Sequence, residues 1–107
     1  MTESPLESTV LRLLRDAGLP IPMLQYVVRD GERFIARLDF AYPATLVGIE
    51  ADGFRYHHGR REFDADRARS NELQALGWHV LRVTSKHLEE DAEAVVAWLR
   101  KALDHPA

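Results

Sequence analysis

The stretch Leu46-Val47-Gly48-Ile49-Glu50-Ala51-Asp52 decides the fold, because it is a nearly continuous apolar run inside a charged chain. Such a run is typical of a central strand that is buried on both faces of a sheet. Glu50 interrupts it and Asp52 ends it, and an unpaired charge in a dry strand costs several kcal/mol. Glu50 and Asp52 therefore need either a partner or a function.

Upstream of this strand, the pattern predicts one helix and a β-hairpin. Apolar residues recur at helical spacing over 6–17, and Gly18-Leu19-Pro20 ends the helix. Alternating patterns then predict strands over 23–30 and 33–41. Asp30-Gly31 between them is a hairpin signal.

Downstream, the pattern predicts a second helix, a fourth strand and a last helix. A polar loop begins at Gly53, and helices are expected over 64–76 and 88–103, with a strand over 79–84 between them. The order α-β-β-β-α-β-α predicts an α/β fold, a mixed sheet flanked by helices on both faces. We expect Trp78 and Trp98 to pack in the core.

Composition limits the class of protein. The 107 residues predict one domain, 1–107, and with 46% hydrophobic and 29% charged residues they exclude disorder for most of the chain. No apolar run is long enough for a membrane span, and the acidic start lacks the features of a secretory signal. We therefore expect a cytoplasmic protein. The absence of cysteine and the scattered histidines predict no zinc site.

Three carboxylates are expected to converge. Period-two geometry places Asp52 on the same face as Glu50, and Asp39 interrupts the preceding strand in the same way. Carboxylates that close repel one another unless a hard cation lies between them, and Mg²⁺ prefers such oxygen ligands. The alternative that stays open is a set of separate ion pairs, with candidate partners Arg37, Arg55 and Arg82.

Glu7 in the first helix has two interpretations. On a helical wheel it lies inside the apolar arc, so its carboxylate could lean over the sheet toward the metal. Its spacing from Ser4 also fits a capping box at the start of the helix. Both interpretations stay open.

The loop after Gly53 is a candidate phosphate contact surface, although the net charge of the chain is −3. The common alternative for such a charge run is a solvated face on an ordinary helix. The residues that we expect to bind nucleic acid are Arg55, His58, Arg60 and Arg61.

Several motifs, taken in order, resemble one family. They are Leu38-Asp39-Phe40-Ala41-Tyr42-Pro43, Gly48-Ile49-Glu50-Ala51-Asp52-Gly53, Tyr56-His57, Asp66-Arg67 and Gly77-Trp78-His79-Val80-Leu81-Arg82. The chain resembles the domain of unknown function 559, a restriction-endonuclease-like family related to the very-short-patch mismatch repair endonucleases. The resemblance runs from about residue 7 to residue 103. It implies the PD-(D/E)XK nuclease fold with its αβββαβ core, followed here by an extra C-terminal helix.

The resemblance also implies roles for the acids. In that superfamily the acids of the second and third strands bind a divalent metal, which points to Asp39 and Glu50, and a first-helix acid, here Glu7, often joins them. The usual lysine two residues after the third-strand acid is Asp52 in this chain. Its work of orienting water would fall to another residue, and the candidates are His57, then Arg55 and Lys86.

Together these observations predict a DNA endonuclease that depends on Mg²⁺ or Mn²⁺. Asp39, Glu50 and Asp52 would hold the metal, with His57 as general acid/base or phosphate contact and Glu7 nearby. The alternative is a catalytically weak or inactive nuclease-fold module that binds DNA or a partner. A homodimer, or a separate DNA-recognition domain or partner, is compatible with both hypotheses.

Overall fold

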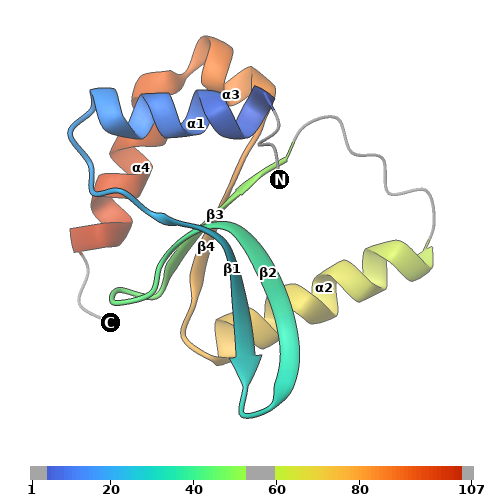
Figure 1. Cartoon of the computed structure of the whole chain (residues 1–107). Coiled ribbons are helices and arrows are strands. Elements are labelled where there is room, and N and C mark those ends of the chain that lie inside the picture. Colours follow the sequence, from blue (N-terminus) through green and yellow to red (C-terminus); the bar gives the residue numbers. More distant parts are fainter. Residues whose placement is uncertain (1–4, 53–59, 105–107) are drawn as a thin grey trace.

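The structure, a computed structural model, describes residues 5–52 and 60–104. The order of elements confirms the predicted α-β-β-β-α-β core, and the last helical region is divided into two helices (Figure 1). The elements are α1 (Pro5–Asp16), β1 (Met23–Asp30), β2 (Arg33–Tyr42), β3 (Val47–Ala51), α2 (Arg60–Ala75), β4 (His79–Val83), α3 (Ser85–Glu90) and α4 (Ala92–Asp104). None of the described helices has the length and apolar character that a membrane span requires.

The four strands form one mixed sheet in the order β1-β2-β3-β4. β1 and β2 are an antiparallel hairpin, and β2 is antiparallel to β3. β4 returns parallel to β3 after α2, so α2 is the crossover of a β-α-β unit. The mixed sheet that the sequence predicted is therefore confirmed.

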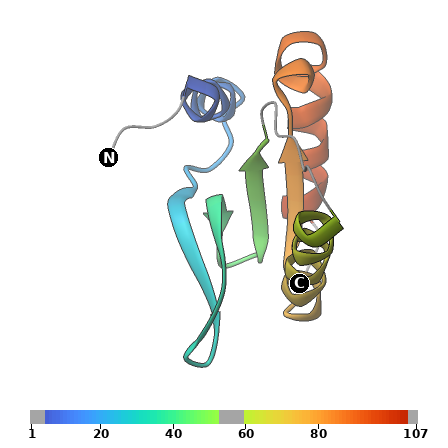
Figure 2. The same cartoon turned by 90° about the vertical axis from the view of Figure 1, so that its right-hand side faces the viewer.

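Helices cover the two faces of the sheet unequally. α1, α3 and α4 gather on one side of β3 and β4, and α2 lies on the other (Figures 1 and 2). The core on the side of α1 and α4 includes Val10, Leu14, Phe40, Ile49 and Leu99. The second core, on the side of α2, contains Val28, Ile35, Ala36, Leu38, Ala41, Leu73 and Trp78.

The β1–β2 hairpin is twisted near its middle. Leu38 and Phe40 are two residues apart but belong to different cores, so β2 exchanges faces between them. The β1–β2 register pairs Leu24 with Phe40 and Tyr26 with Leu38 but leaves out Gln25, which has a positive φ of 49°. A residue in the left-handed region breaks the extended geometry of a strand. The regular alternation predicted for β1 is therefore wrong at Gln25.

Three further expectations need correction. α2 begins at Arg60, so Arg60 and Arg61 form its first turn and do not lie in a loop. The last helix is divided: α3 follows its N-cap Thr84 and ends at Glu90, and its C-cap Asp91 separates it from α4. Trp98 is 40% exposed on α4 and does not pack in the core, whereas Trp78 is buried as expected.

Candidate active site in the fork between β2 and β3

β2 and β3 form a fork whose inner side carries Asp39. Their backbone pairing includes Phe40 and Ile49, and beyond this pair β2 follows β1 away from β3. The Oδ2 atom of Asp39 accepts a hydrogen bond from the backbone N–H of Ala51 at 2.9 Å. Because the N–H and C=O of one strand residue point the same way, the carbonyl oxygen of Ala51 also faces the fork. Asp39 thus bridges the two strands where their ladder ends.

Glu7 of α1 contacts β1 through Gln25. Gln25 donates through Nε2 to the two carboxylate oxygens of Glu7, at 3.4 and 3.5 Å. The residues on either side of Gln25, Leu24 and Tyr26, pair with Phe40 and Leu38, the residues on either side of Asp39. The first-helix acid therefore reaches β1 of the sheet, and its role beside a metal stays a prediction. The capping-box interpretation involves Ser4, which lies outside the described residues.

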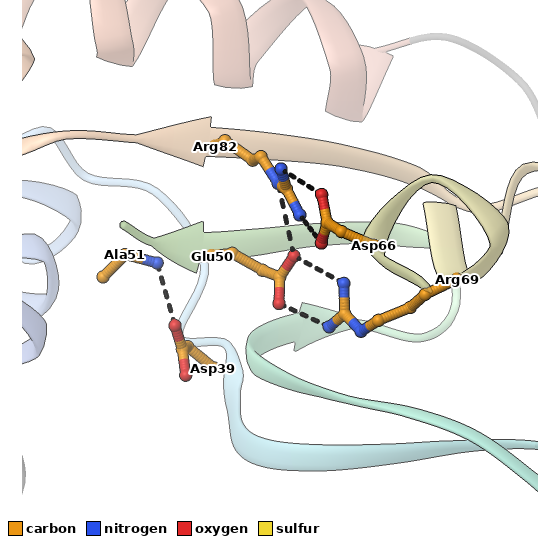
Figure 3. A network of polar contacts seen from close by, with 6 residues as sticks. All are labelled: Asp39, Glu50, Ala51, Asp66, Arg69 and Arg82. Carbon is orange, nitrogen blue, oxygen red and sulfur yellow. Dashed lines mark hydrogen bonds and ion pairs between the residues drawn. The ribbon is translucent and has the colours of Figure 1, made fainter. Parts of the chain in front are cut away.

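Glu50 lies in a network of ion pairs (Figure 3). Arg69 of α2 donates to both of its oxygens, at 3.1 and 2.5 Å. Arg82, its register partner on β4, places Nε 3.7 Å from Glu50 Oε1. Arg82 also donates to both oxygens of Asp66, at 3.0 and 2.7 Å. Two carboxylates and two guanidinium groups thus balance one another and connect α2 to β3 and β4.

Charge stabilises Arg82 in its protonated form. The hydrogen bond that Arg82 donates to Asp66 raises the pKa of the Arg82 guanidinium above its usual value, and the negative charges of Asp66, Glu50 and Asp52 contribute further. The Glu50 side chain is only 17% exposed, so its pairs are shielded from solvent more than surface pairs are. Ion pairing, one of the two interpretations of this acid, is therefore present, with Arg82 as expected and Arg69 in addition.

The three predicted metal ligands line one pocket. A pocket of about 610 Å³ lies between the hairpin, β3 and α2, and its wall contains Asp39, Glu50 and Asp52. The wall also carries the charged residues Arg37, Asp66, Arg69 and Arg82 and the apolar residues Val27, Phe34, Ile35, Ala36 and Ala51. Within the described ranges, no three acidic or histidine side chains are close enough together to hold a metal ion. The expected convergence is therefore seen as a shared pocket and not as a closed cluster.

The remaining site predictions divide into two groups. Arg55, His57 and His58 lie outside the described residues. Arg60 and Arg61 are exposed at the start of α2, where phosphate could reach them. From the sequence, Asp66 was named only within the motif Asp66-Arg67, and neither Asp66 nor Arg69 was predicted to belong to the site. Their spacing of three residues, which places them on one face of α2, is the signal that could have identified them.

The chain has the restriction-endonuclease-like α/β architecture, a mixed four-stranded sheet with acids at the fork between its second and third strands. Residues 7–103 match the REase_MTES_1575 family, and the chain belongs to this restriction-endonuclease-like family. The match covers nearly the same residues as the resemblance seen in the sequence.

Two curated relatives are similar over most of the chain. They are the uncharacterized proteins MT2308 (strain CDC 1551 / Oshkosh) and Rv2248 (strain ATCC 25618 / H37Rv) of Mycobacterium tuberculosis. Each is 30% identical over 102 residues, which are 95% of this chain and 38% of the relative. The chain therefore spans well under half the length of these relatives.

A solved structure shares the fold. The homing endonuclease I-Bth0305I catalytic domain superposes with a TM-score of 0.69 and 21% identity. The match covers 94% of each chain. This similarity confirms the predicted fold.

Proposed function

We propose that the chain is a DNA endonuclease that hydrolyses phosphodiester bonds with the help of a divalent metal, Mg²⁺ or Mn²⁺. The observation that carries the proposal is the fork, where Asp39, Glu50 and Asp52 line one pocket beside three arginines. Family membership and the endonuclease fold support the same reaction class. Carboxylates for a cation and guanidinium groups for phosphate are the two donor types that phosphoryl chemistry requires.

The donor set of the fork fits a hard cation. Asp39 and Asp52 supply carboxylate oxygens and Ala51 a carbonyl oxygen, which are the ligands that Mg²⁺ prefers. The pocket wall has four carboxylates against three guanidinium groups, so a cation reduces its excess negative charge. The chemistry that a bound divalent ion supplies is neutralisation of the phosphate charge and a lowered pKa of water. The hydrogen bond from Ala51 to Asp39 would fix the orientation of this carboxylate before any ligand arrives.

Glu50 needs a rearrangement to act as a ligand. Its two oxygens accept from Arg69, so direct coordination would require Arg69 to release at least one of them. We propose that Asp39 and Asp52 are the principal ligands and that Glu50 joins them only when phosphate draws Arg69 away. Glu7, near Asp39 through Gln25, would hold or orient water on the side of α1.

The proposed reaction is a hydrolysis. A water attacks phosphorus, the P–O3′ bond breaks, the departing O3′ takes a proton from solvent, and the products are a 5′-phosphate and a 3′-hydroxyl. His57, proposed from the sequence alone, would take the proton that the water loses. The guanidinium groups of Arg69 and Arg82 would provide the positive charge that the usual lysine supplies in similar nucleases.

A second candidate function is a nuclease-fold module that binds DNA or a partner without cutting. One specific observation favours it: Arg69 and Arg82 already neutralise Glu50, and the position of the usual lysine is Asp52. DNA binding that falls with salt and occurs without cleavage in any divalent metal would identify this function.

The proposal also includes the type of DNA and the partners of the chain. The resemblance to the domain of unknown function 559 and to very-short-patch repair endonucleases suggests action on duplex DNA. The chain spans 38% of its curated relatives, so further domains or partner proteins could supply sequence recognition. A homodimer would bring two forks together for a double-strand break.

The test is a cleavage assay with purified protein. Supercoiled plasmid, linear duplex and single-stranded DNA are incubated with Mn²⁺, Mg²⁺ or EDTA, and the products are resolved on gels. We expect nicking of plasmid with Mn²⁺ or Mg²⁺ and none with EDTA, with 5′-phosphate ends that ligase can seal. Intact DNA of all three kinds at high protein concentration would contradict the proposal.

A further inference from the structure

A second pocket lies on the other flank of α2. It has a volume of about 480 Å³ and is formed between α2 and β4, the edge strand of the sheet. Its walls contain Glu50, Arg67, Arg69, Ser70, Leu73, Gln74, Gly77, Trp78, His79, Val80 and Arg82. We call this pocket the α2–β4 groove.

The groove and the fork pocket differ in charge. The groove has three guanidinium groups against one carboxylate, whereas the fork pocket has three against four. Glu50, Arg69 and Arg82 belong to both linings. The ion-pair network therefore separates the acidic fork pocket from the basic α2–β4 groove.

The donors of the groove suit a phosphate oxyanion. Arg67, Ser70 and Gln74 lie on successive turns of one flank of α2, and all three are exposed. Guanidinium, hydroxyl and amide groups all donate hydrogen bonds to phosphate. The one carboxylate among the lining residues is Glu50, which Arg69 already binds, so the groove suits an anion better than a metal ion.

Arg67 is available for this contact. Its guanidinium carbon lies 4.8 Å from the centre of the Phe63 ring, and Phe63 is 46% exposed. Stacking on an exposed ring orients a guanidinium group while leaving its N–H donors directed outward. Arg67 thus contributes a preorganised positive charge at the rim.

We propose that the α2–β4 groove binds a backbone phosphate of the nucleic acid whose scissile phosphate occupies the fork. The inference rests on the proposed function and adds a second contact to it. Arg69 and Arg82 belong to both linings. One nucleic-acid strand that crosses these two side chains would therefore present one phosphate to each pocket. The groove would position the strand, and the fork would carry the chemistry.

The first test uses the two tryptophans as reporters. Trp78 lines the groove, and Trp98 lies exposed on α4 on the opposite side of the sheet. The chain has only these two tryptophans, so a ¹H–¹⁵N spectrum contains two indole N–H signals. Inorganic phosphate, a 5′-phosphorylated trinucleotide and the unphosphorylated trinucleoside diphosphate are titrated at constant pH in EDTA.

We expect both oligonucleotides to shift the Trp78 signal until the shift saturates, while the Trp98 signal stays in place. The saturating concentration should be lower for the oligonucleotides than for inorganic phosphate. Saturation by inorganic phosphate at the same concentration as by the oligonucleotides would indicate a site for free anions and overturn the nucleic-acid assignment. If both signals shift equally and without saturation, the groove is not a binding site. These spectra need no metal, so a chain that fails to cut DNA would still give a decisive result.

The second test removes one charge from the groove. Arg67→Gln leaves the Glu50 network intact, and Lys101→Gln on α4 removes the same charge from the far side of the molecule. Binding of a labelled duplex is measured by anisotropy at several salt concentrations in Ca²⁺. Arg67→Gln should weaken binding about fivefold at low salt and reduce the salt slope by about one, because one phosphate contact is lost.

The control Lys101→Gln should bind like the wild type. Equal affinities and slopes for wild type and Arg67→Gln would remove the groove from the footprint. A wild type that binds no DNA in this assay, but whose Trp78 signal saturates with phosphate, would contradict both the proposed function and the nucleic-acid assignment, and would leave a site for free anions.

Discussion

The two faces of the sheet hold their helices by different means. On one face, α1 and α4 bury Val10, Leu14, Val95, Leu99 and Ala102 against the strands. On the other face, α2 buries one side chain, Leu73, near its C-terminal end. The rest of α2 is connected to the sheet by ion pairs, Asp66 with Arg82, Arg69 with Glu50 and Glu72 with Arg33.

This difference separates stability from chemistry. Apolar burial contributes most of the folding free energy, whereas exposed ion pairs contribute little. Ion pairs on the α2 face stabilise the domain less than apolar burial would, but they place arginines and carboxylates where a substrate can reach them. We therefore expect substitutions on the α1–α4 face to affect folding and substitutions on the α2 face to affect function.

The largest stability effect is expected at Leu99, which is 1% exposed between α4 and the sheet. Leu99→Ala should lower the free energy of unfolding by about 2–5 kcal/mol, because it removes buried methyl groups and leaves a cavity. Urea denaturation followed by circular dichroism measures this change. A loss below about 1 kcal/mol would mean that the α1–α4 face is not the main source of stability.

Tyr42 on the same face should make stability depend on alkaline pH. Burial raises the pKa of its hydroxyl to about 12, and the hydroxyl donates to the carbonyl of Pro20 at 2.8 Å. The folded state favours the neutral phenol, so this stability is complete below pH 10 and is lost as the pH rises from about 10 to 12.

The loss that Tyr42 causes should reach about 2 kcal/mol. Urea midpoints of wild type and Tyr42→Phe are compared at pH 9 and pH 11.5. The wild type should lose more stability between these two pH values than the variant. Equal losses would show that other groups cause the alkaline unfolding.

Gly48 sharpens the comparison on the side of α2. A Cβ at this position would lie 2.7 Å from Cδ1 of Leu38, which is fully buried. Gly48→Ala should cost about 1–3 kcal/mol through overpacking. Combining it with Leu38→Val should recover part of the loss, because the shorter side chain makes room. A double variant whose loss is the sum of the two single losses would contradict this contact.

The smallest effects are expected for the ion pairs of α2. Glu50→Gln leaves Arg69 without its charged partner, and both side chains are largely shielded, so the variant should lose about 1–2 kcal/mol. Glu72→Gln removes a similar pair with Arg33 that solvent reaches, and its melting temperature should stay close to that of the wild type. A Glu50→Gln protein more stable than the wild type would indicate unrelieved repulsion among the carboxylates and favour the metal-ligand interpretation of Glu50.

Most of the fold could be predicted because hydrophobic periodicity is a local signal. The apolar run at 46–52 and the Asp30-Gly31 turn identified the sheet and its hairpin. The twist at Gln25 could not be predicted, because no glycine marks the positive φ there. The early start of α2 was missed since its first turns bury no side chain and thus lack an apolar pattern.

The candidate site was predicted in composition but not in pairing. Asp39, Glu50 and Asp52 were identified because each interrupts or ends an apolar strand. The bond between Glu50 and Arg69 depends on the rotation of α2 over the sheet, which tertiary packing determines and the local sequence does not. The α2–β4 groove could not be predicted from the sequence for the same reason, because it too depends on how α2 packs on the sheet.

The central claim is that the fork around Asp39 is a metal-dependent nuclease centre, and the most direct measurement is the rate of plasmid nicking in Mn²⁺ by wild type and Asp39→Asn. Asn keeps the shape and can accept the hydrogen bond from Ala51, but it removes the negative charge that a cation requires. Glu72→Gln serves as the matched control for the loss of one carboxylate. We expect Asp39→Asn to nick at least about 100-fold more slowly than the wild type, with Glu72→Gln unchanged. A folded Asp39→Asn protein that nicks as fast as the wild type would contradict the claim.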